Sequence, residues 1–122
     1  MITIIDELKL FLEESRDRVN NRKWISEKDI KVYIRKTPRI FVNERLVCLD
    51  IGSVEVRIPS KGIFTNFLYE THKLNPWNVT YVENVSSERF ANFFRTRGYK
   101  EGHIGRDPTP CFYRIKHYRS MY

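Results

Sequence analysis

Residues 54–64 form the stretch of this sequence best suited to chemistry, because a strand pattern there runs into a break and then into a helical pattern. Val54 and Val56 alternate with charged residues, as in a half-buried strand. Gly62 lies at the junction, where the missing Cβ lets backbone approach a ligand. A helix N-terminus exposes unpaired N–H groups and partial positive charge, which suit a phosphorylated ligand. Lys61, beside Gly62, could add a charge contact to such a ligand.

Three carboxylates near this stretch could accept a proton from a substrate. Glu55 lies on the strand directly before the loop, and Asp50 and Glu83 lie on neighbouring extended segments. A carboxylate placed beside a bound substrate can act as a general base. The alternative is a solvent-facing carboxylate that pairs with Arg57 or with a lysine of an adjacent strand. Glu55 is the first candidate for catalysis.

Cysteines and histidines do not point to a metal site. Cys48 and Cys111 do not form a CxxC pair, and we expect two reduced, buried thiols. His72, His103 and His117 are far apart and lack the i, i+4 spacing of helical ligands. Because no histidine is near Cys111 in sequence, an acyl-accepting cysteine is not expected either.

The N-terminal half predicts one helix followed by antiparallel strands. Thr3 resembles an N-cap, and an apolar helical stripe extends from it to about Val19, so residues 1–22 form the predicted N-terminal helix. From Ile30 the apolar period changes to two, which is typical of strands. Gly52-Ser53 interrupts the second extended run and predicts a bulge or kink.

The C-terminal half predicts helices that alternate with strands. A helical stripe follows Gly62 and ends before Asn75-Pro76. A short strand over 79–85 and a helix that stops near Gly98 come next, followed by an extended segment from Tyr99 and a final strand over 111–118. Residues 46–85 are therefore a β-α-β unit, whose two strands we expect to be parallel neighbours.

Composition describes one ordinary globular domain with a basic surface. The chain has 122 residues, of which 41% are hydrophobic, and a formal net charge of +7. No apolar run approaches the ~20 residues of a membrane-spanning helix, and charges interrupt the apolar N-terminus at once, so we expect a cytoplasmic protein. Segments 21–45 and 95–122 each sum to +5. They favour anionic partners such as a nucleic acid or an acidic protein, or form a solvated surface.

The order of elements, with the strand-loop-helix of residues 54–64 and the later stretch from Tyr81 to Tyr99, resembles the GNAT (GCN5-related N-acetyltransferase) family. The resemblance covers about residues 30–118 of a single domain, 1–122. It implies an α+β fold: a mixed, mainly antiparallel twisted sheet with helices on both faces and a central β-α-β unit. The whole chain is most similar to short GNAT-like proteins of tailed bacteriophages, which would place it in a host cytoplasm.

This resemblance implies an acetyl-CoA-dependent N-acyltransferase of unknown acceptor. In the family, the strand before the loop offers backbone groups to the pantetheine arm, which would lie along Val54 and Val56. The loop from Ser60 to Phe64 would bind the pyrophosphate. Asn84 lies close to a position where the family commonly has asparagine. Glu55 matches the region from which many members take their general base.

The sequence also departs from the family pattern. Pro59 stands where arginine or glutamine is usual, and Phe64 stands where glycine or alanine is usual. Phe94 occupies the position of the frequent tyrosine general acid and has no proton to donate. The tyrosines that could replace it, or could instead be core or edge aromatics, are Tyr81, Tyr99 and Tyr113. The alternative function is a catalytically degenerate GNAT-fold protein that binds a host protein or nucleic acid.

The C-terminal stretch 113–119 is both basic and aromatic. Lysine and arginine can contact phosphates, and tyrosine can stack on bases, so this stretch could contact nucleic acid. It could equally be an edge strand that its charges protect against aggregation.

Overall fold

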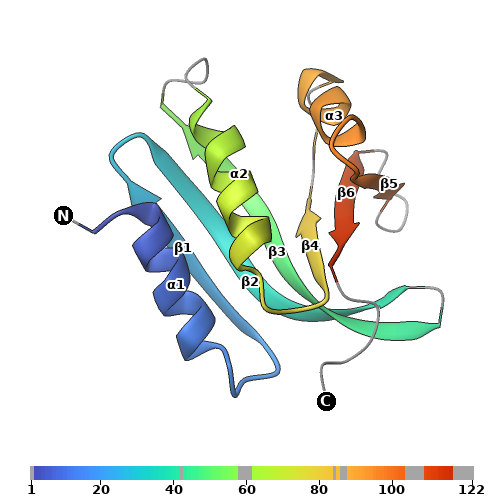
Figure 1. The fold of residues 1–122 in the computed structure, drawn as a ribbon, viewed down its shortest axis with the longest axis horizontal. Coiled ribbons are helices and arrows are strands. Elements are labelled where there is room, and N and C mark those ends of the chain that lie inside the picture. The colour runs from blue at the N-terminus through green and yellow to red at the C-terminus, as the bar shows by residue number, and fades with distance from the viewer. Residues whose placement is uncertain are drawn as a thin grey trace.

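The computed structural model describes residues 2–41, 43–57, 62–83, 85, 88–103 and 109–116, in which three helices and six strands follow one another (Figure 1). The elements are α1 (Ile4–Glu14), β1 (Asn21–Glu27), β2 (Ile30–Phe41), β3 (Glu44–Val56), α2 (Ile63–Leu74), β4 (Val79–Val82), α3 (Glu88–Arg95), β5 (Lys100–His103) and β6 (Pro110–Ile115). Apart from β1, this is the order that the sequence predicts.

All six of these strands belong to one sheet, in the order β1-β2-β3-β4-β6-β5. Neighbouring strands are antiparallel except β3 and β4, which are parallel. The predicted α+β class, with a mixed, mainly antiparallel sheet, is therefore confirmed. The central β-α-β unit is β3-α2-β4, as predicted.

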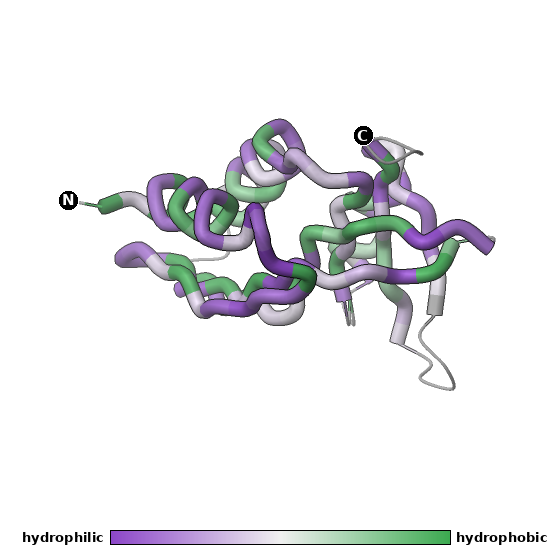
Figure 2. The backbone as a smooth tube through the Cα atoms, turned by 90° about the horizontal axis from the view of Figure 1, so that it is seen from below, coloured by the Kyte–Doolittle hydropathy of each residue, from purple (hydrophilic) through white to green (hydrophobic). Residues whose placement is uncertain are grey.

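Helix α1 begins with the predicted cap. Thr3 Oγ1 accepts a hydrogen bond from the Asp6 N–H, and the Asp6 carboxylate accepts one from the Thr3 N–H, both at 3.1 Å. This reciprocal pair satisfies two donors at the start of the helix. Green and purple segments alternate along α1 in Figure 2, as the apolar stripe predicts.

The prediction of a helix to about Val19 is wrong, because α1 ends at Glu14. Ser15 is buried, and its carbonyl oxygen accepts a hydrogen bond from Lys36 Nζ at 2.8 Å. That contact with β2 ties the chain to the sheet at this point. Residues 1–22 therefore hold a helix, a turn and the beginning of β1.

Strand β1 is the element that the sequence did not predict. It pairs with β2 from Asn21↔Lys36 to Glu27↔Ile30. Ile25 is the one residue of this edge strand that is classed as buried. Because a single buried position gives no alternation, the strand lacks the pattern by which strands are recognised.

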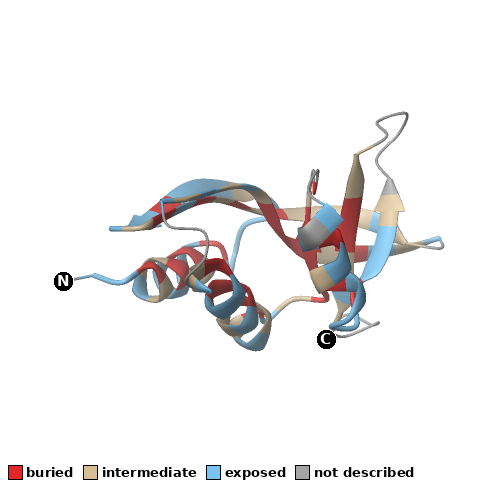
Figure 3. Ribbon diagram, turned by 90° about the horizontal axis from the view of Figure 1, so that it is seen from above, coloured by how far each residue is buried: buried red, intermediate tan, exposed pale blue. Residues whose placement is uncertain are grey.

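The three described helices pack on one face of the sheet, and the predicted placement of helices on both faces is wrong for this part of the chain. Buried residues of α1, α2 and α3 share one core with Ile34, Ile51 and Phe112 of the strands. Figure 3 shows α1 and α2 on one side of the sheet, with buried residues turned toward it. A second core on the opposite face draws its residues from strands, including Leu46 and Cys48.

The predicted bulge is confirmed at Gly52. Tyr33 pairs with Ser53 and Ile34 pairs with Ile51, so Gly52 has no partner of its own in β2. An added Cβ at Gly52 would lie 3.1 Å from the Tyr33 ring, which explains why glycine fits. The extra residue shifts the alternation of β3, and Val54 and Val56 consequently pack against the helix-side core.

Candidate functional site

A cavity of about 600 Å³ opens where β3 and β4 separate, beside the start of α2 and one side of α3. Five of the predicted site residues line it: Val54, Glu55, Val56, Gly62 and Phe64. Ile63 is half-buried and packs against the helix-side core. Ser60, Lys61 and Asn84 lie outside the described residues. We call this cavity the β3–β4 cleft.

The cleft exists because the parallel pairing is short. β3 pairs with β4 from Cys48↔Val79 to Ile51↔Val82, whereas it pairs with β2 out to Val56. Beyond this register, the Glu83 N–H still donates to the Ile51 carbonyl at 3.0 Å, but the Val85 N–H donates to Pro110 at the start of β6. Val85 therefore pairs with the start of β6, and from Ser53 onward no described residue is paired with the β4-facing edge of β3.

The start of α2 resembles an anion site in its backbone geometry. Gly62 has φ of 66° in the left-handed region and makes no side-chain cap hydrogen bond. No acidic residue lies in the first turn, and a Cβ at Gly62 would meet no atom within 4 Å. No carboxylate in the first turn of α2 therefore offsets the partial positive charge at this end of the helix.

Phenylalanines form the apolar wall of the cleft. Phe64 packs edge-to-face on Phe90 at 5.6 Å between ring centroids, so α2 and α3 meet through these rings. Phe94 is 1% exposed and stacks on Phe112 at 5.2 Å. Phe94 thus supplies packing, and it presents no hydroxyl group to the cleft.

Three carboxylates differ sharply in their surroundings. Glu55 is exposed at the cleft and faces Lys31 in the register of β2. The Asp50 carboxylate is fully buried on the sheet face opposite the three described helices, which we call the helix-free face. It accepts hydrogen bonds from Arg35 at 3.2 Å and from Arg39 at 2.5 Å. Burial raises the pKa of Asp50 to about 6, against the opposing effect of the arginines.

Glu83 completes a four-residue ion cluster with Arg35, Arg39 and Asp50. Its Oε1 accepts from both guanidinium groups, while its Oε2 would lie 3.7 Å from a Cβ at Gly52. Glu83 also lines the cleft. The sequence identified Asp50 and Glu83 as alternative bases but did not identify their arginine partners, which lie 11 to 48 residues away along the chain.

The tyrosines considered as replacements for Phe94 do not line the cleft. Burial raises the pKa of Tyr99 to about 12, and its ring lies in a different groove, between α2 and α3. Tyr81 and Tyr113 stack on each other on the helix-free face. Cys48 and Cys111 are free and buried on that same face, as predicted.

The basic C-terminal stretch serves the fold where it is described. β6 lies between β4 and β5, so the expectation of an edge strand is wrong. Lys116 Nζ donates hydrogen bonds to the carbonyl oxygens of His72, Lys73 and Asn75, at the C-terminal end of α2. A lysine at this end satisfies carbonyls that the helix leaves unpaired. Residues 117–119 lie outside the described residues.

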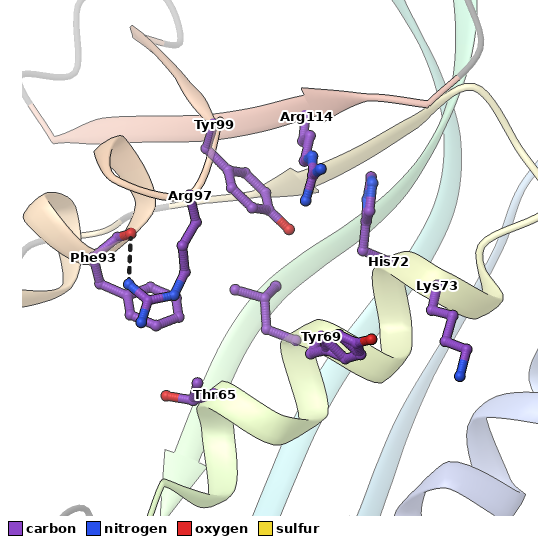
Figure 4. Close-up of a pocket in the computed structure, with 9 residues that line it drawn as sticks. Thr65, Tyr69, His72, Lys73, Phe93, Arg97, Tyr99 and Arg114 are labelled. Carbon is purple, nitrogen blue, oxygen red and sulfur yellow. Dashed lines mark hydrogen bonds between the residues drawn. The ribbon is translucent and has the colours of Figure 1, made fainter.

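A second cavity, which the sequence did not predict, lies between α2 and α3 with β6 beside it (Figure 4). Its volume is about 500 Å³, and we call it the α2–α3 groove. Its residues come from α2, from α3 and the turn after it, and from β6, and no local motif connects them. Thr65 lines both this groove and the cleft.

No protein-family model and no curated protein matches this sequence. Solved structures that are similar include two that each share 10% identity over 90% of this chain and 79% of the other. One is a mutant of the toxin AtaT bound to the C-terminus of the antitoxin AtaR and to acetyl-CoA, with a TM-score of 0.48. The other is the KacTA–DNA complex, with a TM-score of 0.49.

The described residues contain neither a candidate membrane-spanning helix nor a candidate metal site. None of the helices there is long and apolar enough to cross a membrane. Nor do those residues place three or more histidine, cysteine, aspartate or glutamate side chains where they could hold a metal ion.

Proposed function

We propose that this chain is an acyl-CoA-dependent N-acyltransferase of the GNAT type, with acetyl-CoA as its acyl donor. The observation that supports this most is the separation of β3 from β4 after four paired residues, beside a helix start at Gly62. The open edge of β3 offers backbone donors and acceptors, and the cleft walls are apolar. A chain of amides ending in a thioester fits such a cleft, and a diphosphate fits the start of α2.

Each group of the donor has residues to hold it in this proposal. Val54 and Val56 would offer backbone hydrogen bonds to the pantetheine arm, and the loop from Ser60 to Phe64 would bind the diphosphate. Asn84 stays in the proposal as a further contact of the donor. When bound, acetyl-CoA supplies a thioester carbon that an amine can attack.

Glu55 is the proposed proton acceptor. Glu55 is an exposed residue that lines the cleft, and no hydrogen bond or salt bridge engages its carboxylate among the described residues. Glu83 is also at the cleft, but two guanidinium groups already donate to its Oε1. As the amine nitrogen bonds to the acyl carbon and the carbon–sulfur bond breaks, Glu55 or a water molecule that it holds takes the amine proton. Backbone N–H groups near the Gly52 bulge would polarise the carbonyl.

A non-catalytic binding protein is the second candidate, and Phe94 is the observation in its favour. A buried phenylalanine lies where a tyrosine would protonate the leaving thiolate. In that case the two basic segments would bind a host protein or a nucleic acid, and the cleft would be a remnant of the fold. The similarity to phage-encoded proteins stays a prediction.

The test is calorimetric titration with acetyl-CoA of the wild-type chain and two variants, Gly62→Asp and Gly62→Asn. Aspartate and asparagine have nearly the same size, and both tolerate a positive φ, so the pair differs mainly in charge. We expect micromolar binding by the wild type and the Asn variant, and a loss of at least about tenfold with Asp, which repels the diphosphate.

Failure to bind acetyl-CoA at millimolar concentration would falsify the acyltransferase proposal and favour the binding protein. Binding that is equally tight in both variants would place the diphosphate away from Gly62. Circular dichroism of the two variants establishes that each one is folded.

A further inference from the structure

The α2–α3 groove gathers basic side chains without carboxylates. Nine described residues line it, and they include Lys73, Arg97 and Arg114 but no aspartate or glutamate. Within the described part of the chain, none of these three cations forms a salt bridge. The groove is therefore a concave region of unneutralised positive charge.

Arg95 shows that arginines of the same region can be paired. It is two residues from Arg97, and it forms salt bridges with Glu88 at 2.8 Å and with Glu101 at 2.7 Å. Arg114 has no such partner in the described part of the chain, although it lies on β6, which pairs directly with the strand of Glu101. The positive charge of the groove is thus a local feature and does not follow from a general excess of arginine.

Three polar groups point toward one another inside the groove. Figure 4 shows the Tyr99 hydroxyl, the Arg114 guanidinium and the His72 ring converging from three different segments. His72 Nδ1 lies 2.8 Å from Thr80 Oγ1, and this oxygen also accepts from Asn75 Nδ2 at 2.9 Å. Thr80 can therefore donate its own proton to Nδ1, which leaves the Nε2–H of His72 as a donor toward the groove.

Aromatic rings form the walls around these polar groups. Tyr69 is 61% exposed on α2, and the Arg97 guanidinium lies 3.8 Å from the ring centroid of Phe93. Aromatic and guanidinium planes are surfaces on which a nucleobase stacks. Arginine is also the side chain best suited to phosphate oxygens, because its fork of N–H groups can donate two hydrogen bonds to one phosphate.

We propose that the α2–α3 groove binds a nucleoside phosphate, with Arg114, Tyr99 and His72 donating to the phosphate and with Tyr69 or Phe93 against the base. The site is separate from the place of the diphosphate in the β3–β4 cleft. His72 is ten residues from Gly62 on the same helix, which at 1.5 Å per residue is about 15 Å along its axis. The ligand is either a separate nucleotide or the nucleotide end of acyl-CoA, and both present the same chemistry.

The experiment is a titration with adenosine 5′-diphosphate, followed by NMR and calorimetry, of the wild type, Arg114→Gln and Arg45→Gln. The control Arg45 is exposed on the β2–β3 hairpin and undergoes the same change of charge. We expect binding by the wild type and the control, and affinity at least about tenfold lower in Arg114→Gln. Tyr69→Ala, which changes an exposed ring, gives a second weakened variant if Arg114→Gln does not fold.

Two further ligands distinguish the sources of the nucleotide and separate this proposal from the proposed function. S-acetylpantetheine lacks the nucleotide and reports on the cleft alone, so its binding can fail or succeed independently. If adenosine 5′-diphosphate competes with acetyl-CoA, and if Arg114→Gln weakens both, the groove holds the nucleotide end of the donor. Simultaneous binding of both ligands identifies a separate nucleotide.

Two outcomes overturn the proposal. One is the absence of nucleotide binding to the wild type at millimolar concentration. The other is equal affinity in the wild type, Arg114→Gln and Tyr69→Ala, which would place the nucleotide elsewhere on the basic surface.

Discussion

Arginines lie on both faces of the sheet, but their surroundings are opposite. On the helix-free face, Arg35 and Arg39 donate to the buried Asp50 and to Glu83, and the Arg39 guanidinium also lies 4.1 Å from the ring centroid of Tyr81. On the helix side, the arginines of the α2–α3 groove face no carboxylate among the described residues. Paired charge inside a fold is a structural element, whereas unpaired charge in a concave groove is available to a ligand.

Asp50→Ala should have the largest effect on stability. It removes the buried partner of two arginines, and breaking a buried pair costs about 3–5 kcal/mol because the remaining charge is uncompensated. Arg114→Gln, by contrast, removes a cation that forms no salt bridge among the described residues, and it should change the free energy of unfolding by less than about 0.5 kcal/mol. Urea unfolding of both variants measures this difference. Similar stability of the two variants would contradict the distinction between the faces.

The two carboxylates that line the cleft differ in the same way, since Glu83 is paired with arginines and Glu55 forms no salt bridge among the described residues. Glu55→Gln should lower turnover of acetyl-CoA with a panel of primary amines by about 100-fold or more, while donor affinity stays nearly constant. Glu83→Gln instead disturbs the ion cluster and should lower stability more than Glu55→Gln does. Measuring CoA release and unfolding for both variants separates the two roles. Unchanged turnover in Glu55→Gln would remove it as the base.

The pH dependence of stability should identify the buried carboxylate. Because burial raises the pKa of Asp50 from 3.8 to about 6, the folded protein binds this proton more tightly than the unfolded chain does. Its contribution to stability is therefore complete below about pH 4 and is lost as the pH rises through about 6. Asp50→Asn has no such proton and should flatten the curve over this window. Parallel curves for the two proteins would refute the assignment.

Local chemistry explains which parts of the molecule could be predicted from the sequence. The Thr3 cap, the Gly52 bulge and the start of α2 at Gly62 each depend on a few neighbouring residues, and all three are confirmed. The cleft was predictable for the same reason, since residues 54–64 are contiguous. Glu55 and four other predicted site residues line the cleft, and their roles there stay predictions.

Contacts between distant segments account for what the sequence did not reveal. The partners of Arg39 are 11 and 44 residues away, and the groove combines α2, α3 and β6. Strand β1 was missed because its one buried residue, Ile25, gives no period. Which face of the sheet the helices cover likewise depends on how the sheet twists and closes, and no local pattern specifies this.

The smallest predicted effect concerns the start of α2. Like the α2–α3 groove, this helix end carries positive charge without an acidic residue beside it, because the first turn of α2 has none. Aspartate at position 62 can accept hydrogen bonds from the first-turn N–H groups and complement the helix dipole. Gly62→Asp should therefore stabilise the fold by about 0.5 kcal/mol relative to Gly62→Asn at neutral pH. Because this carboxylate has to be ionised to act, the gain should vanish below about pH 4.

A gain in stability together with weaker acetyl-CoA binding would indicate that glycine keeps this helix end open for an anion. Equal stability at both pH values would mean that the helix end gains nothing from negative charge, and the electrostatic argument for a diphosphate there would lose its support.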